Sequence, residues 1–578
     1  MNGLQCLIRI FGIALLYGCG ALAAVAAQTP AAADLILSNG RVHGAVQSIA
    51  IQSGVIIEIG ADADVRKLQS AATRVIDLEG AVVLPGLHDM HVHPLMAGQA
   101  HQQCNFPQGS NAGVIQSTLK KCASQRERGT WILGGQWDAA SVGKPLSTQL
   151  LDAASGAHPV AHPVALGDIS LHSLWVNSKA LQLAGIDAST PDPQGGVIER
   201  DRNGKPTGVL RESATDLVRR VIPPFAAEQN AAALKWSLDL MLSHGITSFM
   251  DAVATEDALR AYAALSDAGQ LKQRVIACIP WGKGVGGPSD ESLIERRNVY
   301  ARARISPSCV KMFLDGVPTD AHTAAMIEPY VGSENSTDVR ARGLLMVPPA
   351  ELHAAVKRFD SQGLLVKFHA AGDGAVRAAL DAIAAARSAN GFTGPLHQVG
   401  HDSFVDPSDI LRAPKLAAVF EFSPYIWFEN PIIGDIRKAV GDERMQRWIP
   451  VKDALEANAL SVPGSDWSVV PSVNPWLGME TLVTRRPPGG KGSQLAPVQA
   501  ITRHQALDMF TINSARAVGQ ADRIGSIERG MLADIIVVDR DPLQADIATV
   551  HDTRVRMTLI NGEVVYRASD MLSSNNNE

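Results

Sequence analysis

Residues 81–94 read AVVLPGLHDMHVHP, and this stretch decides the fold. Its apolar, β-branched beginning predicts a strand, and His91 and His93 stand where that strand ends. Side chains two residues apart on a strand lie on the same face, so both imidazoles point the same way. A His-x-His pair alone is weak evidence of a metal site, because structural histidines produce the same pattern. Its meaning depends on what the later strands carry.

Seven further apolar runs alternate with Ala- and Leu-rich stretches that predict helices. The eight predicted strands lie in runs that begin at residues 81, 245, 274, 309, 364, 396, 416 and 460. Strands separated by helices form parallel βαβ units, and eight such units predict a (β/α)8 TIM barrel of the α/β class. The interval after the first strand is too long for one crossover. We therefore expect a large insertion at about residues 100–240, with strands and turns over the barrel mouth.

Both ends of the chain predict short strands of another kind. Residues 35–61 contain β-branched runs broken by Asn-Gly and Ser-Gly turns, and a similar pattern returns at 525–542 and 555–566. We expect one small β-sandwich domain assembled from both ends. The predicted boundaries are 28–80 and 521–578 for this domain and 81–520 for the barrel with its insertion.

The first 27 residues have the pattern of a secretory signal peptide. A short basic start is followed by the apolar run IFGIALLYGCGALAA and by small residues at Val25 and Ala27. This run is too short and too weakly apolar for a good membrane anchor. We expect cleavage after Ala27 and export across the inner membrane to the periplasm. Cys19 leaves a lipoprotein as the alternative, and only that lipid would make the membrane a partner.

The composition excludes several classes of protein. Of the 578 residues, 46% are hydrophobic and 19% are charged, unlike a disordered, collagen-like or coiled-coil chain. The 52 Lys and Arg residues against 58 Asp and Glu give a net charge of −6, without a long basic run. Nucleic acid is not an expected partner, since phosphate binding needs a concentrated basic face. We expect a small-molecule substrate, and a homo-oligomer is compatible with this composition.

Four cysteines remain after cleavage of the signal, and an oxidising compartment would favour their pairing. They are Cys104, Cys122, Cys278 and Cys309. The first two lie in the same loop-rich insertion, so they either form a disulfide or stay as two buried thiols.

The later predicted strands end in further side chains that bind metals. They are Lys311 in CVKMF, His369 in VKFHAAGD, His401 in VGHD and Asp466 in PGSDW. The interval from His369 to His401 fits one βα unit, and the interval from His401 to Asp466 fits two. Counted from the first strand, these side chains sit on strands 1, 4, 5, 6 and 8, whose C-terminal ends meet at the barrel mouth. Two His, a Lys, two more His and an Asp in this order match a hydrolytic metal centre.

Together these motifs resemble the amidohydrolase superfamily, in particular the amidohydrolase family 3 branch, which includes N-substituted formamide deformylases. The resemblance covers nearly all of residues 35–566. It rests on LPGLHDMHVHP, HSLWVNSKAL, GGVIERDRNGKPTGVLRE, VKMFLDG, HAAGD, SDW and GSIERGMLADIIVVD. One departure is Gly400 in HQVGH, where the family usually carries Glu. This departure keeps His401 as a ligand but removes a carboxylate beside it.

The resemblance implies a metal-dependent hydrolase with one or two divalent ions, expected to be Zn²⁺, because neutral imidazoles and carboxylates suit that metal. The implied ligands are His91, His93, Lys311, His369, His401 and Asp466. Similar enzymes carboxylate the equivalent Lys with CO₂ to form a bridging carbamate, and we expect the same N6-carboxylation of Lys311. A Lys311 paired with Asp315 is the alternative, and Cys309, two residues earlier, could compete as a ligand.

The resemblance also implies roles for the remaining site residues. Metal lowers the pKa of bound water towards neutrality, so hydroxide becomes available as the nucleophile. Asp466 would take the proton as general base and then return it to the leaving nitrogen as general acid. His172 in HSLWVN is the candidate to polarise the carbonyl oxygen, unless it packs a loop. Glu212 and Trp467 are candidates for substrate contact, with a salt-bridged Glu and a core Trp as the alternatives.

Three functions follow in order of preference. The first is hydrolysis of the C–N bond of a linear amide or N-acyl compound, and the second is cleavage of a cyclic amide, a carbamate or an ester by the same site. The third is a metal-stabilised binding protein without catalysis. A protein of this third kind is expected to lack some of the metal ligands or the catalytic base. In this sequence, all six positions carry a suitable residue.

Overall fold

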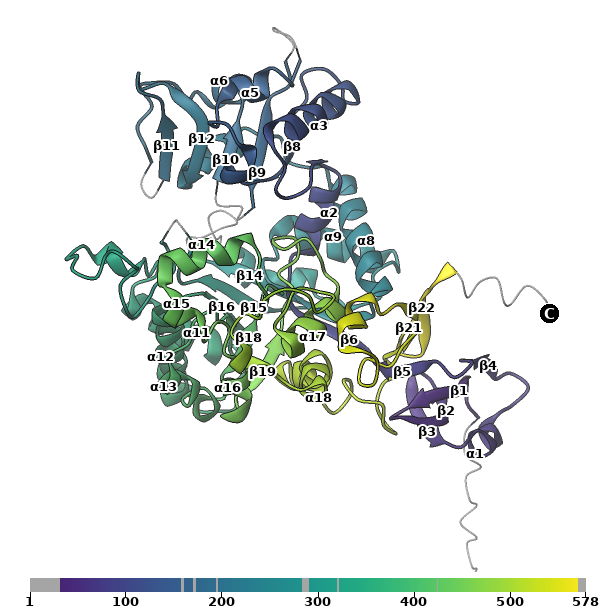
Figure 1. Cartoon of the computed structure of the whole chain (residues 1–578). Helices are drawn as coiled ribbons and strands as arrows, with labels where there is room; N and C mark the ends of the chain where they lie inside the picture. Colours follow the sequence, from purple (N-terminus) through teal and green to yellow (C-terminus); the bar gives the residue numbers. More distant parts are fainter. Residues whose placement is uncertain are drawn as a thin grey trace, which may run out of the picture.

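The computed structural model describes residues 32–156, 161–169, 173–193, 196–282, 291–319, 322–423 and 425–569. The expected signal peptide (1–27), with Cys19, and the candidate His172 lie outside the described residues. Figure 1 shows a central barrel, with the insertion on one side and a sheet built from the two chain ends on another.

Eight parallel strands form the barrel and follow one another around it in chain order. They are β6 (Leu87–Val92), β13 (Ile246–Asp251), β14 (Arg274–Trp281), β15 (Ile305–Phe313), β16 (Leu365–Ala370), β17 (Gln398–His401), β18 (Val419–Phe422) and β19 (Leu460–Pro463). Each overlaps one of the eight predicted runs, so the TIM-barrel prediction is confirmed. Every residue of β17 and β18 is buried, as expected for parallel strands covered on both faces.

Helices connect these strands around the outside of the barrel (Figure 1). They include α8 (Ala227–Ser243), α9 (Glu256–Asp267), α11 (Pro349–Ser361), α12 (Asp373–Asn390), α14 (Pro431–Val440), α15 (Asp442–Met445), α16 (Val451–Glu456) and α17 (Pro475–Thr484). The start of α14 is well defined, because the Asn430 side chain accepts hydrogen bonds from the backbone N–H groups of Ile432 and Ile433. This helix forms one side of the cavity described below.

The predicted insertion follows β6 and forms its own six-stranded sheet, in the order β11-β12-β10-β9-β8-β7. Its elements are α2 (Pro94–His101), β7 (Cys104–Asn105), α3 (Ala112–Ser124), β8 (Ile132–Trp137), β9 (Val164–Asp168), β10 (Ser173–Val176), β11 (Gly196–Arg200), β12 (Pro206–Glu212) and α7 (Asp216–Arg219). A disulfide joins Cys104 to Cys122, which decides between the two expected states of this pair. Ile169 and Arg219 of the insertion line the barrel cavity, so the insertion reaches the barrel mouth as expected.

The two chain ends meet in one sheet. It contains β1 (Leu35–Val42), β2 (Ala45–Gln52), β3 (Val55–Gly60), β4 (Arg74–Asp77), β5 (Val82–Pro85), β20 (Ile535–Val538), β21 (Val555–Ile560) and β22 (Glu563–Arg567). Antiparallel pairing of β20 with β5 joins the C-terminal strands to the N-terminal ones. The run 81–94, predicted as one strand, is therefore divided: β5 belongs to this sheet and β6 to the barrel.

A second disulfide joins Cys278 to Cys309 on the neighbouring barrel strands β14 and β15. The expectation that Cys309 could compete as a metal ligand is therefore wrong, because its sulfur is bonded to the other cysteine. None of the helices in the described part of the chain combines the length and the apolar character needed to span a bilayer.

Candidate metal-dependent active site

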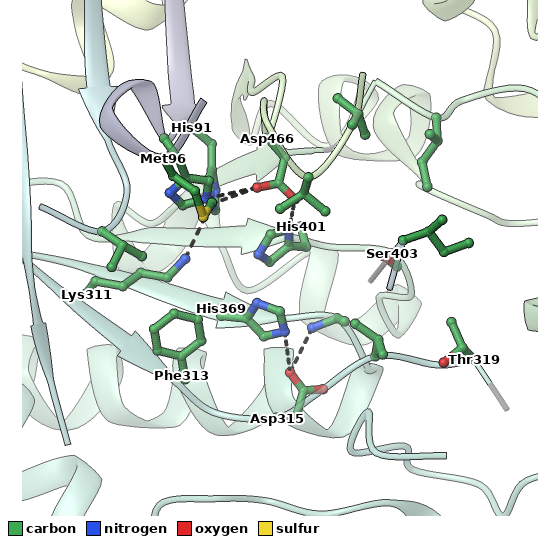
Figure 2. Close-up of a pocket in the computed structure, with 18 of the residues that line it drawn as sticks. His91, Met96, Lys311, Phe313, Asp315, Thr319, His369, His401, Ser403 and Asp466 are labelled. Carbon is green, nitrogen blue, oxygen red and sulfur yellow. Dashed lines mark hydrogen bonds and ion pairs between the residues drawn. The ribbon is translucent and has the colours of Figure 1, made fainter. Parts of the chain in front are cut away.

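A cavity of about 570 Å³ lies at the C-terminal ends of the barrel strands. All six predicted ligand residues line it: His91, His93, Lys311, His369, His401 and Asp466. Figure 2 shows the side chains of Lys311, His401 and Asp466 directed towards one region beside His91. The barrel therefore brings together residues that are up to 375 positions apart in the sequence (466 − 91).

His91, His93 and Asp466 form the tightest group. The Oδ1 atom of Asp466 lies 3.1 Å from His93 Nε2 and 3.7 Å from His91 Nε2. One ligand atom from each of the three residues lies within 4.8 Å of the others. Asp89 holds the two chain segments in place, because its Oδ1 accepts hydrogen bonds from the backbone N–H groups of His91 (3.1 Å) and Ser465 (3.0 Å).

His401 and His369 lie next to this group at unequal distances. His401 Nδ1 is 4.0 Å from the Oδ2 atom of Asp466, and its ring centroid is 4.6 Å from that of His91. His369 is adjacent to His401, at 4.2 Å between ring centroids, but its Nε2 lies 3.0 Å from the carbonyl oxygen of Gly316. Figure 2 shows His369 directed towards Asp315. In this structure His369 therefore stands apart from the His-His-Asp group.

The donor set fits a divalent metal such as Zn²⁺. Imidazole nitrogens and a carboxylate oxygen are the ligand types of catalytic zinc sites. Among the described side chains, His93 Nδ1 and His401 Nε2 are buried polar atoms without a hydrogen-bond partner. Burial, aided by nearby positive charges, holds the pKa of both His91 and His401 well below the usual range. These imidazoles are therefore neutral, the form that binds metal.

Lys311 projects from β15 and is fully buried beside His91. Its Nζ atom lies 3.5 Å from His91 Nε2. Burial, and secondly the charge of Lys367, lower the pKa of Lys311 to about 7. Asp315, the alternative partner, instead accepts hydrogen bonds from three backbone N–H groups, those of Ala325, Ala371 and Gly372. The structure thus places Lys311 at the metal-binding group and not in an ion pair with Asp315.

Glu421 is a site residue that the sequence analysis missed. Its Oε2 atom lies 2.5 Å from His91 Nδ1 and 2.9 Å from the Nζ atom of Lys367, and its side chain is fully buried. Glu421 on β18 is the register partner of Gly400 on β17. A Cβ atom at Gly400 would lie 2.7 Å from Glu421 Oε2, and one at Gly464 would lie 2.4 Å from Oε1.

The carboxylate that Gly400 cannot supply therefore comes from the neighbouring strand. Glu421 accepts the Nδ1 proton of His91, which leaves Nε2 to face the cavity. One signal was available in the sequence: VFEF places a single acidic residue inside a short apolar strand. Strand pairing alone reveals that this residue lies opposite a glycine.

Two other candidates that the structure describes, Glu212 and Trp467, are not among the described residues that line the cavity. Glu212 ends β12 but does not line the cavity, whereas Arg219 from the same insertion does. The Trp467 ring packs against Trp236, with ring centroids 5.9 Å apart, and its carbonyl oxygen accepts the backbone N–H of His93. Trp467 is therefore a buried core residue, which was the alternative to substrate contact.

The fold and the site define a class of protein: a TIM barrel whose histidines and carboxylates meet at the C-terminal ends of the strands. The model of the amidohydrolase family matches residues 74–566. The chain belongs to the amidohydrolase family. This membership confirms the resemblance that the motifs indicate.

Two curated relatives and one solved structure extend over most of the chain. An N-substituted formamide deformylase of Arthrobacter pascens is 26% identical over 554 residues, covering 92% of this chain and 98% of that protein. The Arabidopsis thaliana protein LONG AFTER FAR-RED 3 is 27% identical over 558 residues, covering 92% of each chain. The crystal structure of an uncharacterized metal-dependent hydrolase from Pyrococcus horikoshii has a TM-score of 0.71 at 26% identity, covering 89% of this chain and 99% of that one. The family, the deformylase and the metal-dependent hydrolase support a hydrolase function.

Proposed function

We propose that this protein hydrolyses the C–N bond of a linear amide or N-acyl compound in a metal-dependent reaction. One observation carries the proposal: His91, His93 and Asp466 converge at the floor of a cavity large enough for a small-molecule substrate. The similarity to an N-substituted formamide deformylase supports a linear amide as the substrate. A cyclic amide, a carbamate or an ester is the alternative for the same site.

The residues of the chain have separate roles in this proposal. His91, His93 and Asp466, with His401 beside them, would hold the metal. A bound divalent metal would supply Lewis acidity, which lowers the pKa of water and polarises a carbonyl group. Asp466 accepts the proton of the attacking water on its carboxylate and donates it to the leaving nitrogen. Glu421 keeps the Nδ1 proton of His91 in place, so that Nε2 stays available as a ligand.

We also propose that Lys311 is carboxylated. The carbon of CO₂ would bond to the neutral Nζ atom, one proton would leave, and the product would be a carbamate anion. Burial of Lys311 next to His91 supports this proposal, because it places the new oxygens at the ligand group. Reconstitution of the metal-free protein should then be more complete with bicarbonate present. A mass spectrum of intact protein that shows no gain of CO₂ under these conditions, together with reconstitution that ignores bicarbonate, would exclude the carbamate.

The substrate class is tested with purified protein reconstituted with Zn²⁺ or Mn²⁺. The panel contains formamides, N-acyl amines, N-acyl amino acids, lactams, carbamates and esters, and released amine or acid is measured by chromatography. We expect linear amides to be cleaved, the activity to disappear with a chelator and to return with metal, and His93→Ala to be inactive. Cleavage confined to lactams, carbamates or esters would contradict the linear-amide assignment.

Export to the periplasm remains our proposal for the location of the protein. Its support is the pairing of all four cysteines beyond the expected signal in two disulfides, since disulfides persist in oxidising compartments. Mass analysis of the mature N-terminus distinguishes the two forms. A chain that begins at Gln28 indicates the secreted protein, and a chain that begins with a lipidated Cys19 indicates the lipoprotein.

A further inference from the structure

Away from the metal-binding side chains, the cavity has an apolar wall. We use this term for Ile426, Ile432, Ile436, Trp448 and Val470, all of which line the cavity. Ile432 and Ile436 lie one turn apart on α14, so they present their side chains on one face of the helix. The indole N–H of Trp448 already donates to the carbonyl oxygen of Ile426, at 3.3 Å. This wall therefore offers a substrate hydrophobic surface.

Further apolar side chains lie close to the metal-binding residues. Phe313, Met346 and Met96 also line the cavity. Figure 2 shows Phe313 beside Lys311, whose Nζ atom lies 5.1 Å from the centre of the ring. A substrate whose carbonyl group reaches His91 and Asp466 would therefore share the cavity with these apolar side chains.

Among the lining residues that the structure describes, the cations already have other neighbours and are not available to a substrate carboxylate. The described lining contains two cations, Lys311 and Arg219. Lys311 belongs to the metal-binding group. Arg219 lies 4.0 Å from Asp216 and is also within electrostatic range of Asp168 and Glu212, so its positive charge is already balanced by acidic neighbours.

The acidic residues of the lining also disfavour a carboxylate on the substrate. Asp251 accepts hydrogen bonds from the Tyr262 hydroxyl (3.0 Å) and the backbone N–H of Val253 (3.1 Å), and Asp315 is held by three backbone N–H groups. Asp257 is exposed at the start of α9 and adds negative charge at the rim. A carboxylate on the substrate would therefore lie among acidic side chains and apolar surface.

We propose that the substrate is an uncharged amide with a large apolar substituent, an aromatic ring or an alkyl chain, that packs against the apolar wall. This inference rests on the proposed amide hydrolysis and narrows the class of substrate. It disfavours N-acyl amino acids, because they carry a carboxylate. The cavity of about 570 Å³ lies within the range of about 300–1,000 Å³ that small-molecule sites occupy, well above the need of a formyl or acetyl group alone.

The test uses hydroxamates, which bind metal and are not turned over. Calorimetry with the Zn²⁺-loaded protein compares aceto-, butano-, hexano- and octanohydroxamate with the eight-carbon monohydroxamate that ends in a carboxylate. Burial of a methylene group predicts a gain in affinity of about fourfold for each added carbon until the wall is covered. The carboxylate-ended chain should bind about tenfold or more weakly than octanohydroxamate, because its charge would lose water without gaining a partner.

Two variants locate the effect on the wall. Ile432→Asn should weaken octanohydroxamate binding by about tenfold and leave acetohydroxamate binding unchanged. Leu345→Asn is the matched control, because Leu345 is exposed and does not line the cavity. Ile432→Arg should reverse the preference towards the carboxylate-ended chain. These readouts depend on binding and not on turnover.

The possible outcomes separate this inference from the proposed function. A flat chain-length series, equal or tighter binding of the carboxylate-ended chain, or no binding of octanohydroxamate at all overturns the apolar-substrate inference. A rising series in a protein that cleaves no linear amide contradicts the proposed reaction and leaves the apolar preference standing. An equal effect of Leu345→Asn and Ile432→Asn also overturns the assignment to the wall.

Discussion

At the scale of single residues, Asp466 has two tasks that a substitution can separate. Its carboxylate lies 3.1 Å from His93 Nε2 and would both bind metal and carry the proton. Asp466→Asn retains an oxygen ligand and removes the base, so we expect metal content to stay close to normal. We expect kcat to fall by about 10²–10⁴-fold, the usual contribution of a general acid–base group. Metal analysis and steady-state kinetics on one preparation measure both effects.

A variant that keeps more than about a tenth of the normal kcat would assign the proton to another residue. His93→Ala is the comparison, because it should lose metal and activity together.

Glu421 should act through His91 without touching the substrate. Glu421→Gln keeps the size of the side chain but replaces the carboxyl group that accepts the His91 Nδ1 proton with an amide. We expect metal affinity to fall by about 10–100-fold, the usual effect of losing a partner behind a metal-binding histidine. Glu480→Gln is the matched control, since Glu480 is equally buried and pairs with His551 outside the cavity lining.

Metal titration with a competing chelator measures this change. Excess metal should restore much of the kcat of Glu421→Gln, because the residue positions a ligand and performs no chemistry. Unchanged metal affinity in Glu421→Gln, or an equal loss in Glu480→Gln, would contradict the positioning role. Gly400→Glu alone should be poorly folded, since its side chain would collide with Glu421.

At the scale of elements, Asp360 ties α11 to α12 and to the chain before β17. Its carboxylate accepts hydrogen bonds from His397 Nε2 (2.9 Å), Arg387 (3.0 Å) and Asn390 (2.8 Å). The backbone N–H of Val366 donates to His397 Nδ1, so the hydrogen of that neutral ring lies on Nε2. His397 therefore has a structural role in this cluster.

This cluster predicts a specific pH dependence of stability. The hydrogen bond from His397, followed by that from Asn390, lowers the pKa of Asp360 below its ordinary value of 3.8. A carboxylate whose pKa is lower in the folded state stabilises the protein above the unfolded value and loses this effect as the pH falls through the folded value. Asp360→Asn should therefore cost about 2–4 kcal/mol near neutral pH and progressively less below pH 3.8.

Urea denaturation of both proteins between pH 3 and pH 7 measures this difference. Asp381→Asn is the control, because Asp381 is about half exposed and pairs with Arg412 at the surface. A difference between Asp360→Asn and the unmodified protein that stays constant across this pH range would contradict the prediction.

The barrel strands were predictable because their signal is local. Each is a short apolar run between helical stretches, and the ligands at their ends follow from strand order. The division of residues 81–94 between two sheets was not predictable, because it depends on the strands that β5 and β6 pair with, which lie far away in the sequence. The role of Glu421 and the Cys278–Cys309 bond were not predicted for a related reason. Both depend on which residues of neighbouring strands are paired in the sheet.

At the scale of the whole molecule, the Cys278–Cys309 bond should stabilise the barrel. It joins two residues that are 31 positions apart in the sequence and lie on adjacent strands. The double variant Cys278→Ser, Cys309→Ser should lose about 2–4 kcal/mol of unfolding free energy, the usual effect of removing such a link. Thermal unfolding with and without a reductant measures this effect. The Tm of the unmodified protein should fall on reduction, and the Tm of the double variant should fall by less.

The corresponding Cys104→Ser, Cys122→Ser variant is the comparison. That bond lies within the insertion, so its loss should affect the insertion without lowering metal binding by the barrel. Four thiols that react freely with a thiol reagent in the folded protein, or a Tm that ignores the reductant, would show that the protein does not depend on these bonds.

The central claim is that His91 and His93 of β6 join Asp466 after β19 in one metal site. The most direct measurement is the metal content of protein reconstituted with Zn²⁺ and freed of excess ion, compared with the double variant His91→Ala, His93→Ala. We predict one or two ions per chain in the unmodified protein and the loss of at least one ion, with all activity, in the double variant. Full metal occupancy in the double variant would contradict the claim.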